Sequence, residues 1–284
     1  METGKPSRTA LGAAHHRAAH QILEGGRIFT DPLAVRILGG DVQAIARRAE
    51  ESLSGPLMRI FIAARTRFAE DALAAAVEGG VRQLVVLGAG LDTFAYRSPF
   101  GDRLRVFEVD HAATQAWKRG LLDEAGIAIP EWVTFAPADF EREGLEECLA
   151  RVGFDAGQAA FFTWLGVVPY LTEDAVWTTL RFIGGLRGGA EVVFDYPEPP
   201  EALSPKMRER HDRLAERVAS LGEAWLSSFD PGRLRAGLSE AGFSEIEDLG
   251  PRQIAERYFP QWVAAMPKRG GHVVRGRGMD AGAA

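Results

Sequence analysis

The sequence predicts an α/β fold in which helices cover both faces of a mostly parallel β-sheet. From residue 81 onward, short apolar runs rich in β-branched and aromatic residues alternate with segments of helical periodicity. The first of these runs, LVVL at 84–87, leads directly into a glycine turn. Residues 1–78 have only helical patterns, which predicts a helical addition in front of the sheet.

The N-terminal addition contains two well-marked helices. The segment TDPLAVRILGG offers an N-cap at Thr30 or Asp31, a proline in the first turn and a glycine stop. A longer helix is expected from Pro56, with Arg65 at the edge of its inward face. That face is formed by apolar residues that recur every three or four positions, namely Leu57, Phe61, Ala64 and Phe68.

Five strands are expected to run parallel, because helices separate most of the β-rich runs. The runs occupy residues 81–90, 103–110, 132–140, 158–168 and 190–197. The intervening helices occupy residues 111–126, 143–154 and 172–189. The carboxyl ends of parallel strands share one edge of the sheet, where open α/β sheets bind ligands. Functional residues should therefore follow the strands.

An inserted helix is expected over this edge, at about residues 198–228. Turn-forming residues at 197–205 precede it, and an inward stripe with helical spacing continues to Trp225. The stripe consists of Met207, His211, Leu214, Val218, Leu221 and Trp225.

The C-terminal part of the chain is expected to close the sheet. A last helix at 230–243 precedes two β-rich runs, 243–250 and 270–277, which suit an antiparallel strand pair. The predicted organisation is thus a helical cap at 1–78 and an α/β domain at 79–284 that carries the inserted helix.

Composition narrows the class of protein. The chain has 284 residues and a formal net charge of −6, and its basic residues are scattered, which argues against nucleic-acid binding. The longest apolar run, AAFFTWLGVVPYL, is too short to span a bilayer, and the N-terminus lacks the apolar core of a signal peptide. Cys148 is the single cysteine and is expected to be a buried thiol. A cytoplasmic location without membrane association is predicted.

The glycine turn indicates a nucleoside ligand. Gly88 and Gly90 follow the first strand, but Thr93 occupies the place of the third glycine of a dinucleotide-binding pattern. A nicotinamide or flavin dinucleotide is therefore less favoured than a smaller nucleoside. An acidic residue at the end of the second strand would bind the ribose hydroxyls, and Asp110 is preferred to Glu108 because it ends the run.

A further acid and aromatic follow the third run. Asp139 and Phe140 would accept a hydrogen bond from an adenine amino group and face the adenine ring.

These segments together resemble a known family. VVLGAGLDTFAYR, FEVDH, PADF and TWLGVVPYLT are similar to motifs of the leucine carboxyl methyltransferase family of class I S-adenosylmethionine-dependent methyltransferases, and specifically to its bacterial O-methyltransferase branch. The resemblance extends over most of the chain. It implies the class I methyltransferase Rossmann-like fold, with a seven-stranded, mostly parallel sheet, an antiparallel closing strand and an N-terminal helical addition. It also implies S-adenosylmethionine as methyl donor.

The resemblance implies roles for residues on the donor side. Gly88, Ala89 and Gly90 would approach the amino acid part of the donor, and Asp110 would bind its ribose. The adenine would meet Asp139 and Phe140, and Trp164 is expected at the same cofactor site.

The acceptor side is implied by two further matches and one departure. Arg65 matches a family arginine that meets the carboxylate of the donor or the acceptor, and Tyr170 matches a tyrosine that orients the acceptor. A basic residue near the start of the family chain corresponds to Arg17. The departure is Leu165, which replaces the glutamate of the family's W-E-G-V motif and cannot accept a hydrogen bond.

The expected reaction is methyl transfer to the carboxylate of a small molecule. The step is an in-line displacement that needs alignment but no metal, and a carboxylate is already ionised at neutral pH. Arg65 and Tyr170 would hold it. A phenolic acceptor would instead need a base, for which His211 is the candidate. A protein-directed reaction on a C-terminal leucine, suggested by the family name, is disfavoured because the inserted helix suggests a covered pocket. A non-catalytic S-adenosylmethionine-binding protein, suggested by Leu165, and an NAD-linked oxidoreductase, disfavoured by Thr93, are the remaining alternatives.

Overall fold

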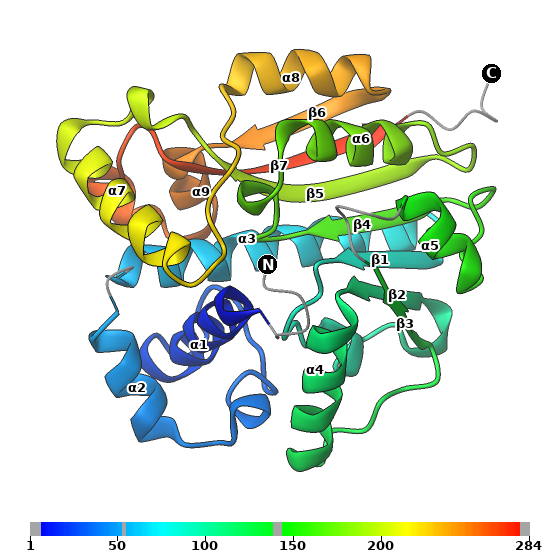
Figure 1. Ribbon diagram of the computed structural model, residues 1–284, viewed down its shortest axis with the longest axis horizontal. Helices are drawn as coiled ribbons and strands as arrows, with labels where there is room; N and C mark the ends of the chain where they lie inside the picture. Colours follow the sequence, from blue (N-terminus) through cyan, green and yellow to red (C-terminus); the bar gives the residue numbers. More distant parts are fainter. Residues whose placement is uncertain (1–6, 53–54, 139–143, 279–284) are drawn as a thin grey trace.

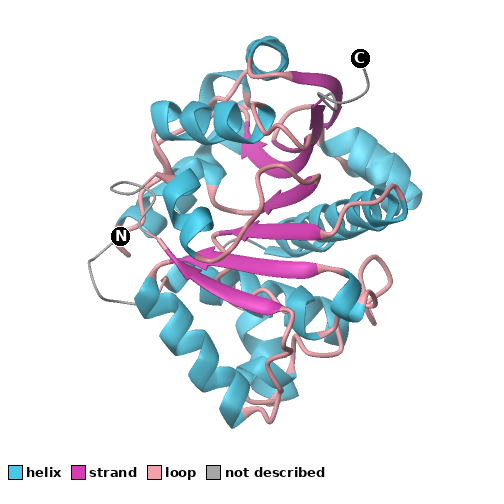
Figure 2. Cartoon of the chain, turned by 90° about the vertical axis from the view of Figure 1, so that its right-hand side faces the viewer, coloured by secondary structure: helices cyan, strands magenta, loops and turns pink. Residues whose placement is uncertain are grey.

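A computed structural model describes residues 7–52, 55–138 and 144–278. Its centre is a seven-stranded sheet of order β3-β2-β1-β4-β5-β7-β6, flanked by helices on both faces (Figures 1 and 2). The strands β1 to β5 are parallel, and β7 runs antiparallel between β5 and β6. Their bounds are β1 Gln83–Leu87, β2 Arg105–Asp110, β3 Val133–Pro137, β4 Ala160–Trp164, β5 Ala190–Pro197, β6 Phe243–Leu249 and β7 Gly271–Gly278. The predicted fold class is confirmed.

The strand order explains where a ligand can bind. The chain proceeds outward from β1 to β3 and then returns to place β4 on the other side of β1. The crevice between the carboxyl ends of β1 and β4 is therefore the topological switch point of the sheet. All five residues of β1 are buried, which agrees with its continuous apolar sequence. The glycine turn after Leu87 lies directly at the switch point.

The N-terminal addition consists of α1 (Arg8–Leu23), α2 (Val42–Glu50) and α3 (Gly55–Glu78). The predicted long helix is α3, which packs on the sheet through Ala64, Phe68 and Leu73. The helix expected at 30–39 is instead a series of turns that ends in a single 3₁₀ turn, Arg36–Leu38.

The predicted N-cap and glycine stop are both present in this segment, but they enclose a shorter structure than the expected helix. The Asp31 carboxylate caps the amides of Leu33 and Ala34, at 3.0 and 3.1 Å, and it also accepts a hydrogen bond from Thr93. Gly39, with a φ of 86°, then reverses the chain only eight residues later. The segment between this cap and Gly39 holds a 3₁₀ turn and no α-helix.

Helices α4 (Ala112–Glu124), α5 (Leu145–Arg151) and α6 (Glu173–Gly184) are the predicted crossovers, and α8 (Pro231–Glu240) precedes the closing strands. The structure adds α9 (Pro251–Tyr258), which the sequence analysis did not anticipate.

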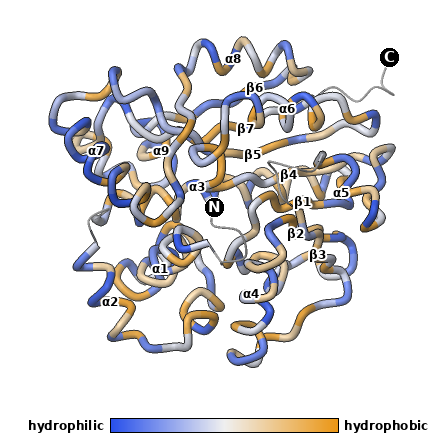
Figure 3. The backbone as a smooth tube through the Cα atoms, viewed as in Figure 1, coloured by the Kyte–Doolittle hydropathy of each residue, from blue (hydrophilic) through white to orange (hydrophobic). Residues whose placement is uncertain are grey.

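The inserted helix is α7 (Pro205–Ala219), a hydrophilic helix that lies over the carboxyl edge of the sheet (Figures 1 and 3). Val218 is its one buried residue. It ends before the predicted stripe does, because Gly222 adopts a φ of 79° and turns the chain. The return segment is then tied to the fold by Leu226, whose amide donates to the Pro169 carbonyl at 2.6 Å.

Candidate functional site

A large cavity occupies the carboxyl edge of the sheet. It has a volume of about 1500 Å³ and is bounded by α1, α2, the first half of α3, α7 and the residues that follow β1, β2, β4 and β5. Drug-sized ligands usually occupy cavities of about 300–1,000 Å³. This cavity therefore has room for two substrates side by side.

The glycine turn forms one wall through its backbone. Gly88 and Gly90 have φ angles of 65° and 44°, which other residues rarely adopt. A Cβ on Gly88 would lie 2.3 Å from Val167 Cγ2, and one on Gly90 would lie 3.0 Å from Ala10 Cβ. The amides of Gly88 and Ala89 donate to the Val109 carbonyl at 2.8 and 3.1 Å, which fixes the turn against β2.

Asp110 lines the cavity at the end of β2. Its Oδ2 accepts from the Gly90 amide at 2.6 Å, and its Oδ1 accepts from the His111 amide at 2.7 Å. Burial raises the pKa of this carboxyl group. Each oxygen keeps a further lone pair that ribose hydroxyls can use.

Glu108, the alternative acid, points away from the cavity. It is 1% exposed and binds Lys118 Nζ at 2.8 Å and the Tyr96 hydroxyl at 3.0 Å. The structure therefore places Asp110, and not Glu108, at the site.

Arg65 projects from α3 into the cavity and forms a buried ion pair. Its Nη1 lies 2.6 Å from Oδ2 of Asp195, at the end of β5, and Oδ1 of Asp195 accepts from the Gly166 amide at 2.6 Å. The Nε of Arg65 is buried and has no hydrogen-bond partner within the described residues. This donor is therefore left unsatisfied within the described residues.

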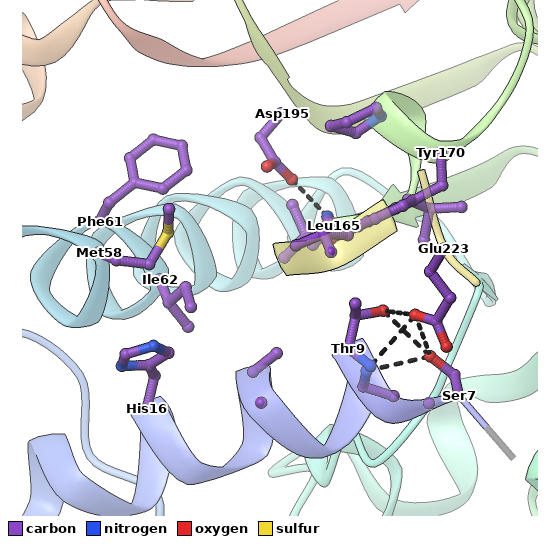
Figure 4. Close-up of a pocket in the computed structure, with 18 of the residues that line it drawn as sticks. Ser7, Thr9, His16, Met58, Phe61, Ile62, Leu165, Tyr170, Asp195 and Glu223 are labelled. Atoms are coloured by element: carbon purple, nitrogen blue, oxygen red, sulfur yellow. Dashed lines mark hydrogen bonds between the residues drawn. The ribbon is translucent and has the colours of Figure 1, made fainter. Parts of the chain in front are cut away.

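Asp195 is a lining residue that the sequence analysis did not single out, although it follows a predicted strand. It lies close to Leu165, which occupies the place of the family glutamate (Figure 4). A carboxylate is thus present in this part of the cavity, and β5 supplies it.

Tyr170 lines the cavity from the 3₁₀ turn after β4. Burial raises the pKa of its phenol, and hydrogen bonds with the Trp225 and Thr9 side chains oppose that shift only in part. The negative charge of Glu223 also raises this pKa and the charge of Arg65 lowers it, and all three residues line the cavity. At neutral pH Tyr170 is therefore a neutral phenol on the cavity wall.

The remaining predicted residues have different positions. His211 lines the cavity from α7, where its ring lies 5.1 Å from that of Trp225 and its Nδ1 lies 3.1 Å from Asp212.

Trp164, expected at the cofactor site, instead lies in the core with a fully buried side chain that packs on Phe194. Alternation along β4 directs Trp164 and Leu165 to opposite faces of the sheet. Asp139 and Phe140 lie outside the described residues.

Arg17 also borders the cavity, from α1. Its guanidinium donates to the Leu91 carbonyl and lies 3.5 Å from Asp92. Its charge helps to lower the pKa of Asp92 although burial acts in the opposite direction. This pair joins α1 to the loop after β1.

His16 lines the cavity, a position that the sequence analysis did not predict. It projects from α1 toward Met58, Phe61 and Ile62 of α3 (Figure 4). Burial, followed by the charges of Arg59 and Arg65, lowers the pKa of His16 to about 4. Its imidazole is therefore neutral at neutral pH, and its buried Nδ1 has no partner among the described residues.

Glu223 closes the cavity over the beginning of α1 (Figure 4). Its carboxylate accepts from the Arg8 amide at 2.8 Å, the Thr9 amide at 3.1 Å, the Ser7 hydroxyl at 3.3 Å and the Thr9 hydroxyl. A carboxylate at a helix N-terminus is favoured by the helix dipole. The segment after α7 is thereby fastened to a residue more than 200 positions away.

No cluster of three potential metal ligands occurs in the described parts of the chain. Nor do those parts contain a helix with the length and apolarity needed to traverse a bilayer.

Comparisons with known proteins agree with this architecture. Residues 10–184 match the leucine carboxyl methyltransferase family. A Bacillus subtilis protein named "Putative S-adenosyl-L-methionine-dependent methyltransferase YktD" is 33% identical over 69% of this chain and 65% of its own. A protein of the same general name from Mycolicibacterium paratuberculosis is 30% identical over 85% of this chain and 78% of its own.

Solved structures with low sequence identity share the fold. A Thermobifida fusca structure titled "putative methyltransferase" has a TM-score of 0.58 at 17% identity and covers 98% of this chain and 96% of its own. A DUF574 family protein from Streptomyces avermitilis has a TM-score of 0.53 at 18% identity, with coverages of 93% and 97%.

Proposed function

The chain belongs to the leucine carboxyl methyltransferase family, and from this premise we propose that it transfers a methyl group from S-adenosylmethionine to the carboxylate of a small molecule. The donor supplies an electrophilic methyl group on a sulfonium. The protein's task is to align the acceptor oxygen with that group and to exclude water.

Several features of the cavity fit the donor. The glycine turn lines the cavity with its backbone, and Asp110 offers free lone pairs for the ribose. Asp195 also lines the cavity and offers a negative charge for the ammonium group of the donor. Leu165 then costs less affinity than its replacement of a glutamate suggests, because Asp195 lies beside it.

The observation that carries the carboxylate acceptor is that Tyr170 and Arg65 both line the cavity. A neutral phenol hydroxyl and a guanidinium can both donate hydrogen bonds, which is what an ionised carboxylate requires. The carboxylate needs no base, and one of its oxygens stays free to attack the methyl carbon. The reaction forms a C–O bond, breaks the C–S bond and leaves neutral S-adenosylhomocysteine.

The test is an assay of methyl transfer from labelled S-adenosylmethionine to a panel of carboxylic acids and phenols. A labelled product that mild alkali cleaves is a methyl ester and supports the proposal. An alkali-stable product, or turnover with phenols alone, contradicts it. Tight donor binding without turnover on any acceptor would favour a non-catalytic binding protein.

His16 favours hydroxyl methylation as the second candidate. Its neutral imidazole lines the cavity, whereas His211 lies beside Asp212 on α7. A general base typically contributes about 10²- to 10⁴-fold to proton abstraction, and a pKa of about 4 puts His16 at the low end of that range. His16→Asn should lower turnover by about 100-fold if the acceptor is a hydroxyl and by less than about tenfold if it is a carboxylate.

A further inference from the structure

Helix α1 forms one wall of the cavity (Figure 4) and lies along the loop that follows β1. Ala10, Ala13 and Arg17 are three and four residues apart, so they share one face of the helix, and all three line the cavity. Ala10 Cβ lies 3.0 Å from the position of a Cβ on Gly90. The Arg17 guanidinium donates to the Leu91 carbonyl. The glycine turn and α1 are therefore adjoining walls of the cavity, in direct contact.

A buried hydrogen bond fastens the segment after α1 to the same loop. The Thr93 hydroxyl donates to Oδ2 of Asp31 at 2.6 Å. Thr93 is 0% exposed and Asp31 is 1% exposed, so water cannot replace either partner. The Asp31 amide donates to Oε1 of Gln21, on α1, at 2.9 Å, and the Asp31 carboxylate lies 3.9 Å from Nε of Arg17. Thr93 is thus connected to α1 through Asp31.

This bond lies behind the cavity wall. Neither Asp31 nor Thr93 is among the described residues that line the cavity, whereas the neighbouring Leu91 and Asp92 are. The residue that departs from the dinucleotide-binding pattern, Thr93, therefore makes a contact that a glycine cannot make. Any effect of its hydroxyl on a ligand must pass through α1 and the loop.

We propose that Thr93 is a positioning residue of the donor site, whose bond to Asp31 holds α1 against the glycine turn. In this docked arrangement, Ala10, Ala13 and Arg17 complete the cavity around the donor. If the donor binds only the docked arrangement, its apparent affinity is proportional to the fraction of molecules in which α1 is docked. Thr93 thus raises donor affinity without touching the donor. The inference does not depend on which acceptor the protein uses.

Calorimetry with S-adenosylhomocysteine on variants of Thr93 tests this inference without any acceptor. Thr93→Val keeps nearly the shape of the side chain and removes the hydroxyl. Asp31 retains two backbone amides and the Arg97 guanidinium as partners, so the segment should still fold. We expect S-adenosylhomocysteine to bind Thr93→Val at least about tenfold more weakly than the wild type, and Thr93→Ser, which keeps the hydroxyl, within about threefold of it.

The matched control is Thr114→Val, on α4. Thr114 is also 0% exposed, but its hydroxyl has no partner in the described residues, and it is not among those that line the cavity. This variant should bind S-adenosylhomocysteine as the wild type does. Thr93→Ala is a second variant without the hydroxyl and should lose affinity as Thr93→Val does.

Hydrogen exchange separates positioning from stability. In Thr93→Val, the amides of α1 should exchange faster than in the wild type, while those of α4 keep their rates, and S-adenosylhomocysteine should slow the exchange of α1 in both proteins. A role in stability alone would speed exchange in both helices and leave the donor affinity of the folded protein unchanged.

Unchanged affinity in Thr93→Val or Thr93→Ala, an equal loss in Thr114→Val or Thr93→Ser, or unaltered exchange of α1 in Thr93→Val would overturn the inference. Donor affinity that depends on the Thr93 hydroxyl in a protein that forms no methyl ester would leave the inference intact and refute the proposed function instead.

Discussion

The two sides of the cavity are built by different means. On the strand side, the Asp110 carboxylate accepts from the Gly90 amide, and the amides of Gly88 and Ala89 donate to the Val109 carbonyl, all within 23 consecutive residues, 88–110. On the lid side, formed by α7 and the segment after it, nine of the fifteen residues of α7 are exposed and one is buried, and Glu223 fastens the segment to Ser7 and Thr9 at the other end of the sequence. The strand side is thus held by local contacts, and the lid side by contacts between distant segments.

This difference has a functional meaning. A donor common to many methyltransferases can be bound by a fixed set of strand ends, whereas the acceptor is specific to each enzyme and is contacted by the helices that cover them. Substitutions on the strand side should therefore change donor affinity, and substitutions near the lid should change turnover.

The largest effect is expected from Asp110→Ala. The change removes a buried carboxylate that would accept two hydrogen bonds from ribose, each worth about 1.5–3 kcal/mol when one partner is charged. Affinity for S-adenosylhomocysteine should fall by about 100-fold or more, as measured by calorimetry. Asp102→Ala, which removes an exposed aspartate outside the cavity, is the control. Unchanged affinity in Asp110→Ala would place the ribose elsewhere.

A steric probe of the same side is Gly88→Ala. The new Cβ would lie 2.3 Å from Val167 Cγ2 at a positive φ, so the turn must shift, at a cost of about 1–3 kcal/mol of unfolding free energy. Gly101→Ala is the matched control, because its φ is also positive but no atom lies within 4 Å of the new Cβ.

The control should show only the backbone part of the loss, about 1 kcal/mol, and no loss of donor affinity. Adding Val167→Ala to Gly88→Ala should restore part of the stability. Equal losses in Gly88→Ala and Gly101→Ala, by denaturant unfolding, would show that close packing of the turn is unimportant.

The strand side is also the part that the sequence could predict. Glycines and acids that end apolar runs are local signals, so Gly88, Gly90 and Asp110 were assigned to the cavity from their own neighbourhoods. The position of His16 in the cavity wall depends on contacts between segments far apart in the sequence. The same is true of the hydrogen bonds from the start of α1 to Glu223, and no local pattern predicts either feature. Trp164 is expected at the cofactor site but lies in the core, because a shift of one position along a strand moves a side chain from one face of the sheet to the other. The sequence pattern does not fix this position.

Tyr170, which follows β4 and bonds to Trp225 of the lid side, separates acceptor effects from donor effects in the Tyr170→Phe variant. Loss of the hydroxyl would remove the hydrogen bond proposed to the acceptor carboxylate, so kcat should fall by about tenfold while affinity for S-adenosylhomocysteine stays within about twofold. Tyr258→Phe is the control, because this hydroxyl is buried without a partner in the described residues and lies outside the cavity. A loss of donor affinity equal to the loss of turnover would assign Tyr170 to the donor.

The smallest expected effect is a change in the free energy of unfolding when His272, a buried histidine beside the cavity, is replaced. His272 lies between Asp248 at 2.9 Å and Glu198 at 2.8 Å, and Glu198 lines the cavity. Burial acts to lower the pKa of His272, but its hydrogen bonds and ion pairs with the two carboxylates outweigh burial and raise the pKa above 6.5.

The stabilisation from His272 is therefore complete below pH 6.5 and is lost as the pH rises through the raised value. His272→Gln should reduce the free energy of unfolding by about 1–3 kcal/mol at pH 6, and by less as the pH increases. Urea unfolding from pH 6 to pH 9 measures this difference. A gap between wild type and variant that stays constant over that range would mean that His272 contributes through packing on Tyr196 and not through its charge.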